Sequence, residues 1–288
     1  MNNMKIGWIG IGNMGVPMVK NLVKDGFNVT IYNRTREKAL ALQQETGVAI
    51  AESPAALIQQ VDVVITMVAD DHALEDVYTG ADGILSGKPD KDVLAIDMST
   101  VSPEITQKLA GLCMEKGVHY LDAPVSGSVK PAEDRQLVIM AGGKKEDFER
   151  AQPIFNTLGK ASLLLGDNGA GNKTKLAINM FLAIVVQGFS EAVLFAQQNG
   201  INTEQFLEVV NNGAVGSGIT KLKSAAILQD NFKPAFALKH LVKDLKLAQN
   251  QGLHLPAGQA VLNTYQQALA AGLGDDDMIA IINQLKNL

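Results

Sequence analysis

A lysine and an asparagine four residues apart are the first candidates in this sequence for a reaction site, with the lysine as the acid. Lys175 and Asn179 belong to the segment Gly169-Ala-Gly-Asn-Lys-Thr-Lys175-Leu-Ala-Ile-Asn179, in which glycines give way to a long apolar helix. Residues four apart share one face of a helix. An ammonium group on that face could stabilise the negative charge that develops on a carbonyl oxygen and donate a proton to it. The alternative is a solvated lysine at a helix start, so the case for a site depends on the rest of the chain.

A glycine motif near the beginning of the sequence predicts a dinucleotide-binding turn. The motif Gly10-x-Gly12-x-x-Gly15 follows a short apolar strand and precedes a helix expected from about Val16 to Lys24. The first glycine permits a tight turn, the second lets a pyrophosphate approach the backbone, and the third packs the helix against the strand. Glycine-rich turns are common, but the strand before and the helix after favour cofactor binding. The cofactor-binding residues expected here are Gly10, Ile11, Gly12, Asn13, Met14 and Gly15.

The residues after the second expected strand, 27–32, indicate which dinucleotide is bound. Enzymes that prefer NAD usually have an acidic residue here, which binds the ribose hydroxyls. This chain has Asn33, Arg34 and Thr35 instead. The guanidinium of Arg34 can bind a 2′-phosphate, and Asn33 and Thr35 can add neutral hydrogen bonds. A helix N-cap beside a solvated arginine is the alternative, and both can hold at once. We therefore predict NADPH/NADP+ as the cofactor.

Further candidates follow other expected strands. Val68 and Thr100 each end a buried apolar run, and the turn Ser126-Gly127-Ser128 follows the strand expected at 119–124. Open parallel sheets bind their ligands at the carboxyl ends of the strands. The hydroxyl and backbone N–H groups of the serine turn suit a carboxylate or carbonyl oxygen. Serine and glycine are also ordinary turn residues, so a plain turn is an equal alternative for this segment alone.

The elements that must position these residues fall into two groups. Short apolar strands alternate with helices through residues 1–166, which predicts an α/β domain with a doubly wound parallel sheet. Only helices are expected over residues 167–288. The first, from about Asn172 to Gln198, would be about 40 Å long and would join the two domains. Later helices are expected at about 203–211, 234–251, 256–272 and 278–288. Wide apolar helix faces predict a homodimer or homotetramer.

The composition limits the classes of function. The 288 residues are 47% hydrophobic and 19% charged, as in globular proteins, and the net charge of −5 without a basic block argues against nucleic-acid binding. The apolar segment 176–195 is interrupted by polar residues, which argues against a membrane span. Cys113 is the only cysteine and the four histidines lack metal-ligand spacing, so we expect no disulfide and no metal. The start of the sequence lacks the regions of a signal peptide, which predicts a cytoplasmic location.

Four blocks of residues resemble the β-hydroxyacid dehydrogenase family, which contains 3-hydroxyisobutyrate dehydrogenase, tartronate semialdehyde reductase and 6-phosphogluconate dehydrogenase. The blocks are Gly7-Trp-Ile-Gly-Ile-Gly-Asn-Met-Gly15, Asp122-Ala-Pro-Val-Ser-Gly127, Gly171-Asn-Lys-Thr-Lys175-Leu-Ala-Ile-Asn179 and Lys243-Asp244-Leu245. They occur in the family's order and span nearly the whole chain. Within the family, the segments 33–35, 126–134 and 234–240 are most similar to the glyoxylate/succinic semialdehyde reductases.

The resemblance implies an NADP-binding Rossmann domain over residues 1–166 and an all-helical substrate and oligomerisation domain over residues 167–288. It implies that Lys175 is the catalytic lysine and that Asn179 holds the lysine or the substrate. Ser126 and Gly127, with Ser128 beside them, match the loop that binds the substrate carboxylate.

The same resemblance assigns residues outside these blocks. Thr100 matches a position near both the nicotinamide and the substrate. Phe236 and Asp244 match residues of the substrate pocket, and Lys243 matches a residue that contacts the cofactor. Arg135 departs from the family, which usually has glycine at this position, so the expected substrate preference is least defined there.

The function predicted from these observations is NADPH-dependent reduction of a small carboxylate-bearing aldehyde, such as glyoxylate or succinic semialdehyde, with Lys175 as the general acid. An NAD-dependent 3-hydroxyisobutyrate-type dehydrogenase, oxidising a hydroxy acid, is the first alternative. An imine reductase of similar architecture is disfavoured because Lys175 is present. A non-catalytic NADP-binding scaffold protein is the alternative from a different class, and the lysine argues against it as well.

Overall fold

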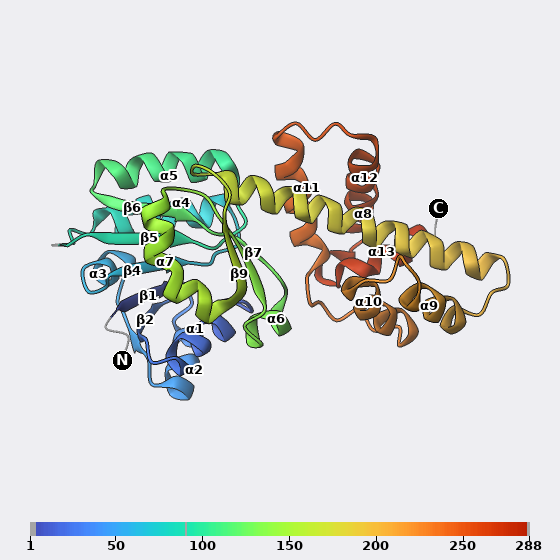
Figure 1. Ribbon diagram of the computed structural model, residues 1–288, viewed down its shortest axis with the longest axis horizontal. Helices are drawn as coiled ribbons and strands as arrows, with labels where there is room; N and C mark the ends of the chain where they lie inside the picture. Colours follow the sequence, from blue (N-terminus) through green and yellow to red (C-terminus); the bar gives the residue numbers. More distant parts are fainter. Residues whose placement is uncertain (1–3, 90, 287–288) are drawn as a thin grey trace. The chain divides into compact units, whose positions relative to one another are not determined.

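The structure, a computed structural model, describes residues 4–89 and 91–286 and consists of two compact units (Figure 1). The first unit comprises Met1–Lys175 and the second comprises Leu176–Leu288. The division falls within helix α8 (Ala170–Gln198), which begins in the first unit and continues into the second. Within the described ranges, every strand lies in the first unit.

Six parallel strands form the main sheet of the first unit, in the order β3-β2-β1-β4-β5-β6. They are β1 (Lys5–Ile9), β2 (Asn28–Tyr32), β3 (Ala49–Ile50), β4 (Val63–Thr66), β5 (Val93–Asp97) and β6 (Val118–Asp122). Strands β4 and β5 are buried along their whole length, as expected when helices cover both faces of a parallel sheet. The predicted doubly wound sheet is confirmed. Its strand order reverses between β1 and β4, and ligands bind at the carboxyl ends of the strands beside such a reversal.

Helices cover both faces of this sheet and create two apolar cores. One core packs α1 (Gly15–Lys24), α2 (Arg36–Thr46) and α7 (Lys145–Leu158), and the other packs α3 (Pro54–Ile58), α4 (Asp71–Thr79) and α5 (Pro103–Glu115). Ser53 and Ser102 begin α3 and α5 as predicted. Each serine Oγ accepts the N–H three residues later at 3.1 Å, and a proline follows each serine.

A second, smaller sheet follows β6 in the first unit. It contains β7 (Val125–Ser126), β8 (Leu137–Ala141) and β9 (Gly159–Leu164), with β7 and β8 antiparallel and β8 and β9 parallel. A bridge between Asp122 and Gly142 connects it to the main sheet. The segment between β7 and β8, expected as a loop, contains a short helix, α6 (Val129–Glu133).

The second unit is helical among its described residues. It contains the greater part of α8, then α9 (Thr203–Asn212), α10 (Gly218–Leu228), α11 (Leu238–Asn250), α12 (Pro256–Ala270) and α13 (Ile281–Leu285). Its core is formed by side chains from α8, α9, α11, α12 and residues 278–282. The fold class predicted from the sequence, an α/β domain followed by helices and joined by one long helix, is therefore confirmed.

Three expectations for this unit are corrected. The helix expected from Pro234 begins at Leu238, because the Asp277 carboxylate accepts the N–H groups of Ala235 and Phe236 at 2.9 and 3.3 Å and holds them in a bend before the helix. Phe236 therefore precedes α11. Helix α10 was not expected, and its cap is a Ser217–Thr220 pair. The helix expected over Met278–Leu288 is a 3-10 turn followed by α13, and Leu288 lies outside the described residues.

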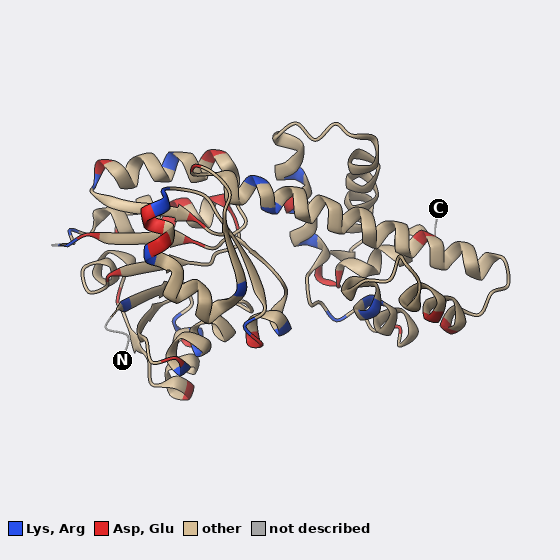
Figure 2. Cartoon of the chain, in the orientation of Figure 1, with Lys and Arg blue, Asp and Glu red and all other residues tan. Residues whose placement is uncertain are grey.

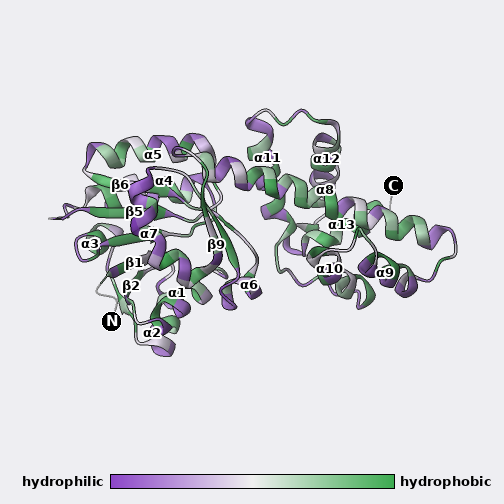
Figure 3. Ribbon diagram, viewed as in Figure 1, coloured by the Kyte–Doolittle hydropathy of each residue, from purple (hydrophilic) through white to green (hydrophobic). Residues whose placement is uncertain are grey.

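Helix α8 is long and apolar enough to span a membrane by length and composition. Hydrophobic residues run along much of it (Figure 3). The core helix of a water-soluble protein can have the same length and composition. Ala183, Val186 and Val193 of α8 are buried in the core of the second unit, and 39% of the most apolar stretch of the helix is buried.

Candidate active site

The glycine turn after β1 has the geometry that a dinucleotide requires. Gly10 has a φ of +105°, and an added Cβ would lie 2.2 Å from the Met67 carbonyl oxygen. A Cβ on Gly15 would lie 2.1 Å from the Gly10 carbonyl oxygen. A Cβ on Gly12 would meet nothing within 4 Å. Two of the glycines are therefore required by the fold, whereas Gly12 faces open space where a pyrophosphate could approach the start of α1.

The three residues after β2 divide into one that supports the turn and two that are exposed. Asn33 Oδ1 accepts the N–H of Ile11 at 2.8 Å, and Asn33 Nδ2 donates to the Thr35 carbonyl oxygen at 2.8 Å. Thr35 is the N-cap residue of α2 without a side-chain cap bond. Arg34 is exposed, and among the described residues no ion pair to it is found. Arg36, two residues later, binds Glu52 instead. Arg34 is thus the charged group available to a phosphate here.

The side-chain hydroxyls of Thr66 and Ser99 make hydrogen bonds at the carboxyl ends of β4 and β5. The Val68 N–H donates to Ser99 Oγ at 2.9 Å, and Ser99 Oγ donates to Asp97 Oδ1 at 2.7 Å. Thr66 Oγ1 also donates to Asp97 at 2.8 Å. Asp97 is fully buried, and burial raises its pKa to about 7 although these hydroxyl bonds favour the ionised form. The predicted ligand residues Val68 and Thr100, both partly exposed, lie at this edge.

The serine turn is tied to the dinucleotide helix. Ser126 ends β7, Gly127 is exposed with a φ of +136°, and Ser128 precedes α6. Asn21 of α1 donates to the Ala132 carbonyl oxygen of α6 at 2.8 Å. The segment that carries Ser126–Ser128 is therefore held against α1 within the first unit.

Arg135 shows why a glycine suits the end of this segment. Its φ is +60°, a left-handed conformation that side chains seldom adopt. Its guanidinium donates to both carboxylate oxygens of Asp25, at 2.7 and 2.9 Å, and Asp25 also accepts Thr157 Oγ1 at 3.0 Å. This bidentate pair offsets the strained backbone. The departure from glycine therefore adds a second link between the serine segment and α1.

Lys175 lies near the start of α8 and is 9% exposed. The sequence had not indicated what fixes this helix end. The start of α8 is held to the sheet by hydrogen bonds of Asp122 and Asn172, which are both fully buried. Asp122 is the register partner of Asp97 across β5 and β6. Burial raises the pKa of Asp122 to about 6, while backbone N–H groups from Gly169 and Asn172 favour the carboxylate.

The second unit brings together three of the predicted residues. Asn179 Nδ2 donates to Asp244 Oδ2 at 2.6 Å, and Lys243 Nζ lies 3.1 Å from Asp244 Oδ1. Asn179 and Asp244 are buried. Asn179 Oδ1 is also buried, and no hydrogen-bond partner is found for it among the described residues. A buried acceptor of this kind usually has a partner, which a ligand hydroxyl or ammonium group would supply.

Phe236, the fourth predicted residue of this unit, is positioned by a buried ion pair. Lys223 Nζ lies 2.7 Å from Asp277 Oδ1, and both side chains are almost fully buried. Asp277 Oδ2 accepts the Phe236 N–H, as described above. Sequence reasoning missed this pair, because Lys223 and Asp277 lie 54 residues apart.

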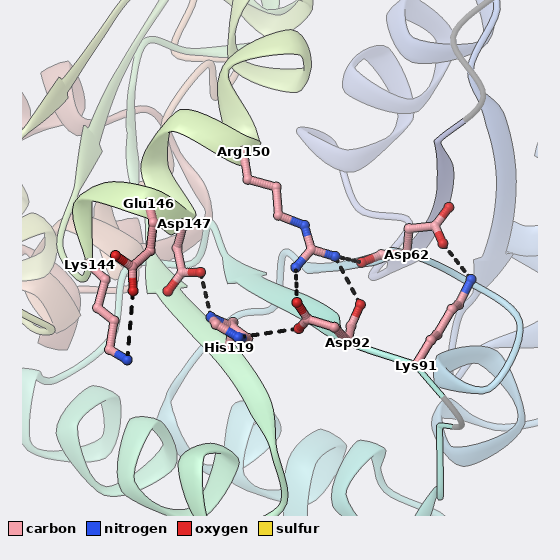
Figure 4. A network of polar contacts seen from close by, with 8 residues as sticks. All are labelled: Asp62, Lys91, Asp92, His119, Lys144, Glu146, Asp147 and Arg150. Carbon is pink, nitrogen blue, oxygen red and sulfur yellow. Dashed lines mark hydrogen bonds and ion pairs between the residues drawn. The ribbon is translucent and has the colours of Figure 1, made fainter.

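The opposite, amino edge of the main sheet carries a different set of charges (Figure 4). His119 Nδ1 lies 2.6 Å from Asp147 Oδ1 and its Nε2 lies 3.2 Å from Asp92, which also pairs with Arg150. Acidic and basic residues are interspersed in the first half of α7, which contributes Asp147 and Arg150 (Figure 2). These charged side chains pair with one another, as in a structural network. Within residues 4–89 and 91–286, no group of three or more His, Cys, Asp or Glu side chains could hold a metal ion.

Comparisons with known proteins cover both units. A family model described as the NAD binding domain of 6-phosphogluconate dehydrogenase matches residues 5–166. A second, described as NAD-binding of NADP-dependent 3-hydroxyisobutyrate dehydrogenase, matches residues 169–285. The chain is 38% identical to glyoxylate/succinic semialdehyde reductase 1 of Arabidopsis thaliana over 291 residues, which cover 98% of this chain and 99% of that protein.

Two further relatives are a metabolic enzyme and a nuclear factor. The solved structure of 3-hydroxyisobutyrate dehydrogenase from Mycobacterium tuberculosis with L-serine superposes with a TM-score of 0.88 at 29% identity, covering 98% of this chain and 99% of that one. The cytokine-like nuclear factor N-PAC of Homo sapiens is 36% identical over 96% of this chain but only 50% of its own length. Similarity at this level thus includes both metabolic enzymes and part of a nuclear factor.

Proposed function

The chain belongs to the 3-hydroxyisobutyrate dehydrogenase family of NAD(P)-dependent oxidoreductases, and we propose that it reduces small aldehyde acids of the glyoxylate and succinic semialdehyde type with NADPH. The observation that carries this proposal is Lys175, a buried lysine near the start of the helix that leaves the sheet. The similarity to the Arabidopsis reductase over nearly the whole chain supports the substrate class.

The chemistry assigned to the side chains follows from charge. When bound, the dinucleotide supplies the hydride that adds to the aldehyde carbon. The aldehyde oxygen gains negative charge as this happens, and the Lys175 ammonium stabilises that charge and donates a proton to the oxygen. Asn179, one helical turn later, orients the lysine or the hydroxyl through its buried Oδ1. The Ser126–Ser128 turn binds the substrate carboxylate through hydroxyl and N–H donors.

A substrate panel tests the proposal. The purified protein is mixed with NADPH or NADH and with glyoxylate, succinic semialdehyde or longer aldehydes that lack a carboxylate, and loss of reduced dinucleotide is followed by absorbance. We expect the highest kcat/KM with NADPH and the two aldehyde acids. Activity confined to oxidation of 3-hydroxyisobutyrate with NAD would replace this proposal by the dehydrogenase alternative. Tight NADPH binding without turnover of any substrate would favour the alternative of a non-catalytic NADP-binding scaffold protein.

Cofactor preference gives a second test, at Arg34. Replacing Arg34 with alanine removes the charged group available to the 2′-phosphate, and a hydrogen bond to a charged group contributes about 1.5–3 kcal/mol. We expect the Kd of NADPH to rise about 10- to 100-fold and the Kd of NADH to change little. Fluorescence titration with both cofactors measures this. Arg36→Ala is the matched control, because Arg36 is also exposed but pairs with Glu52. Equal weakening of both cofactors by Arg34→Ala would contradict the assignment.

We further propose that the protein is a homodimer formed through α8. One face of this helix carries residues spaced alternately three and four apart, all exposed except the half-buried Val185: Ile178, Phe181, Val185, Gly188, Ala192 and Phe195. This spacing produces a coiled-coil seam. If two copies pack antiparallel about a twofold axis between residues 186 and 187, Phe181 meets Ala192 and Val185 meets Gly188. Large side chains then oppose small ones along the centre of the seam, which suits a second copy of the same helix.

A charge placed in the seam tests this dimer. Phe181 is 62% exposed in the single chain, so Phe181→Glu should leave the fold unchanged while burying an unpaired charge between two copies. We expect sedimentation velocity to give a dimer for the natural chain and a monomer for the variant. Leu222→Glu, at a comparably exposed residue of α10, serves as the control and should remain dimeric. A monomeric natural chain, or an unchanged Phe181→Glu, would refute the seam.

A further inference from the structure

A buried carboxylate at the end of β6 binds the amino end of α8. Asp122 Oδ1 accepts the N–H of Gly169 at 2.7 Å, and Asp122 Oδ2 accepts the N–H of Asn172 at 2.9 Å. The first N–H groups of a helix have no partners within the helix, and a negative charge beside them is favourable. Asp122 thus acts as a cap supplied by a residue 47 positions earlier in the sequence.

Two glycines make room for this carboxylate. An added Cβ on Gly142 would lie 2.6 Å from Asp122 Oδ1, and one on Gly171 would lie 2.8 Å from Asp122 Oδ2. The backbone of β6 also pairs with Gly142, since the Asp122 N–H donates to the Gly142 carbonyl oxygen at 3.1 Å and the Gly142 N–H donates to the Asp122 carbonyl oxygen at 2.7 Å. The carboxylate is therefore enclosed on several sides, and its two oxygens have fixed directions.

The side chain of Asn172 fixes the same helical turn in a second direction. Its Oδ1 accepts the N–H of Val101 at 3.1 Å, and its Nδ2 donates to Thr106 Oγ1 at 3.2 Å. Val101 directly follows Thr100, a residue assigned to the nicotinamide and substrate. The first turn of α8 is thus held both to the end of β6 and to the segment that joins β5 to α5.

We propose that Asp122 is a positioning residue for the reaction, which fixes the first turn of α8 and thereby the place from which Lys175 acts. The inference rests on the proposed function, in which Lys175 is the general acid. Lys175 follows Asn172 by three residues, which is about 4.5 Å along the helix axis and on the same face. A shift of the first turn would therefore move the lysine almost equally. The Asp122 carboxylate bonds only to Gly169 and Asn172 and not to the glycine turn or Arg34, where the phosphates of the dinucleotide are expected to bind, so we expect the affinity for NADPH to depend little on Asp122.

Asp122→Asn tests this role with almost no change of shape. The amide keeps one acceptor but places an NH2 group against the other helix N–H, so one of the two bonds is lost. We expect kcat with succinic semialdehyde, expressed per bound NADPH, to fall about 10- to 100-fold, the cost of a small misplacement of a catalytic group. The Kd of NADPH should change little. Hydrogen exchange of the backbone amides of residues 169–176 should become faster.

Asp147→Asn is the matched control. Asp147 is also a buried aspartate, and its partner His119 belongs to the same strand as Asp122 but lies at the opposite edge of the sheet (Figure 4). This variant should lose thermal stability and keep its kcat per bound NADPH. If Asp122→Asn does not fold, Asn172→Ala removes the side-chain bonds to Val101 and Thr106 while retaining the Asp122 bonds, and kcat should again fall.

The outcomes of these experiments distinguish the positioning role of Asp122 from the proposed reductase function. A folded Asp122→Asn protein with unchanged kcat, or a kcat loss shared equally by Asp147→Asn, would overturn the positioning role. Unchanged hydrogen exchange at residues 169–176 would overturn it as well. Absence of turnover in the natural chain with every aldehyde acid would instead refute the proposed function, and hydrogen exchange would still decide whether Asp122 holds the helix.

Discussion

Replacing Lys175 with methionine is expected to lower kcat for succinic semialdehyde by about 10²- to 10⁴-fold, the range typical of a lost general acid. Methionine retains most of the length of the side chain, so the buried surroundings of Lys175 remain filled. Binding of NADPH should be nearly unchanged, because the glycine turn, Asn33 and Arg34 belong to a different part of the first unit. Stopped-flow absorbance and fluorescence titration measure the two quantities separately.

Lys173 provides the control for this substitution. It lies on the same helix two residues earlier, is exposed and carries the same charge. Lys173→Met removes one positive charge from the same region and should leave kcat near that of the natural chain. A similar loss in both variants would indicate a general electrostatic effect. A Lys175→Met variant that binds NADPH and retains full turnover would exclude Lys175 as the acid.

Alanine at Gly12 should weaken NADPH binding and spare the fold, whereas alanine at Gly15, in the same turn, should destabilise the fold. Gly12→Ala places its methyl group in open space, so the variant should fold normally. That space is where the pyrophosphate approaches, so the Kd of NADPH should rise about tenfold or more, a loss of about 1.4 kcal/mol. Gly15→Ala places a Cβ 2.1 Å from the Gly10 carbonyl oxygen and 3.1 Å from the Trp8 ring nitrogen. Overpacking of this kind should cost about 3 kcal/mol of the free energy of unfolding or more.

Chemical denaturation and NADPH titration of the two variants decide between these outcomes. The expected pattern is a folded Gly12→Ala protein with weak binding and an unstable Gly15→Ala protein. If Gly12→Ala binds NADPH as tightly as the natural chain, the dinucleotide does not approach this turn, and the assignment of residues 10–15 is wrong.

Elements with strong local signals could be predicted from the sequence. The alternation of apolar strands and helices gave the doubly wound sheet, and Ser-Pro pairs gave the starts of α3 and α5, because these features depend on residues a few positions apart. The start of α11 could not be predicted, since Asp277 holds Ala235 and Phe236 from 42 and 41 positions away. The order of strands in the sheet and the separate sheet of β7, β8 and β9 likewise depend on contacts between distant segments.

The same distinction applies to the candidate site. The glycine motif, Arg34 and Lys175 were recognisable by residue type and spacing. The contacts of Asn33 with Ile11 were not, because the sequence does not show where a side-chain amide points. Asp122 stood in a recognisable block, yet its bonds to Gly169 and Asn172 require the folded chain. A buried aspartate at the carboxyl end of an apolar strand is the signal that could have drawn attention to it.

A crystal structure of the full chain with NADP+ and 4-hydroxybutyrate, the alcohol formed from succinic semialdehyde, would test the role of Lys175 most directly. We predict that Lys175 Nζ lies within about 2.6–3.2 Å of the hydroxyl oxygen, as proton transfer requires, with the nicotinamide against the carbon that bears it. A complex in which both ligands are bound and another group contacts that oxygen, with Lys175 directed elsewhere, would contradict the account.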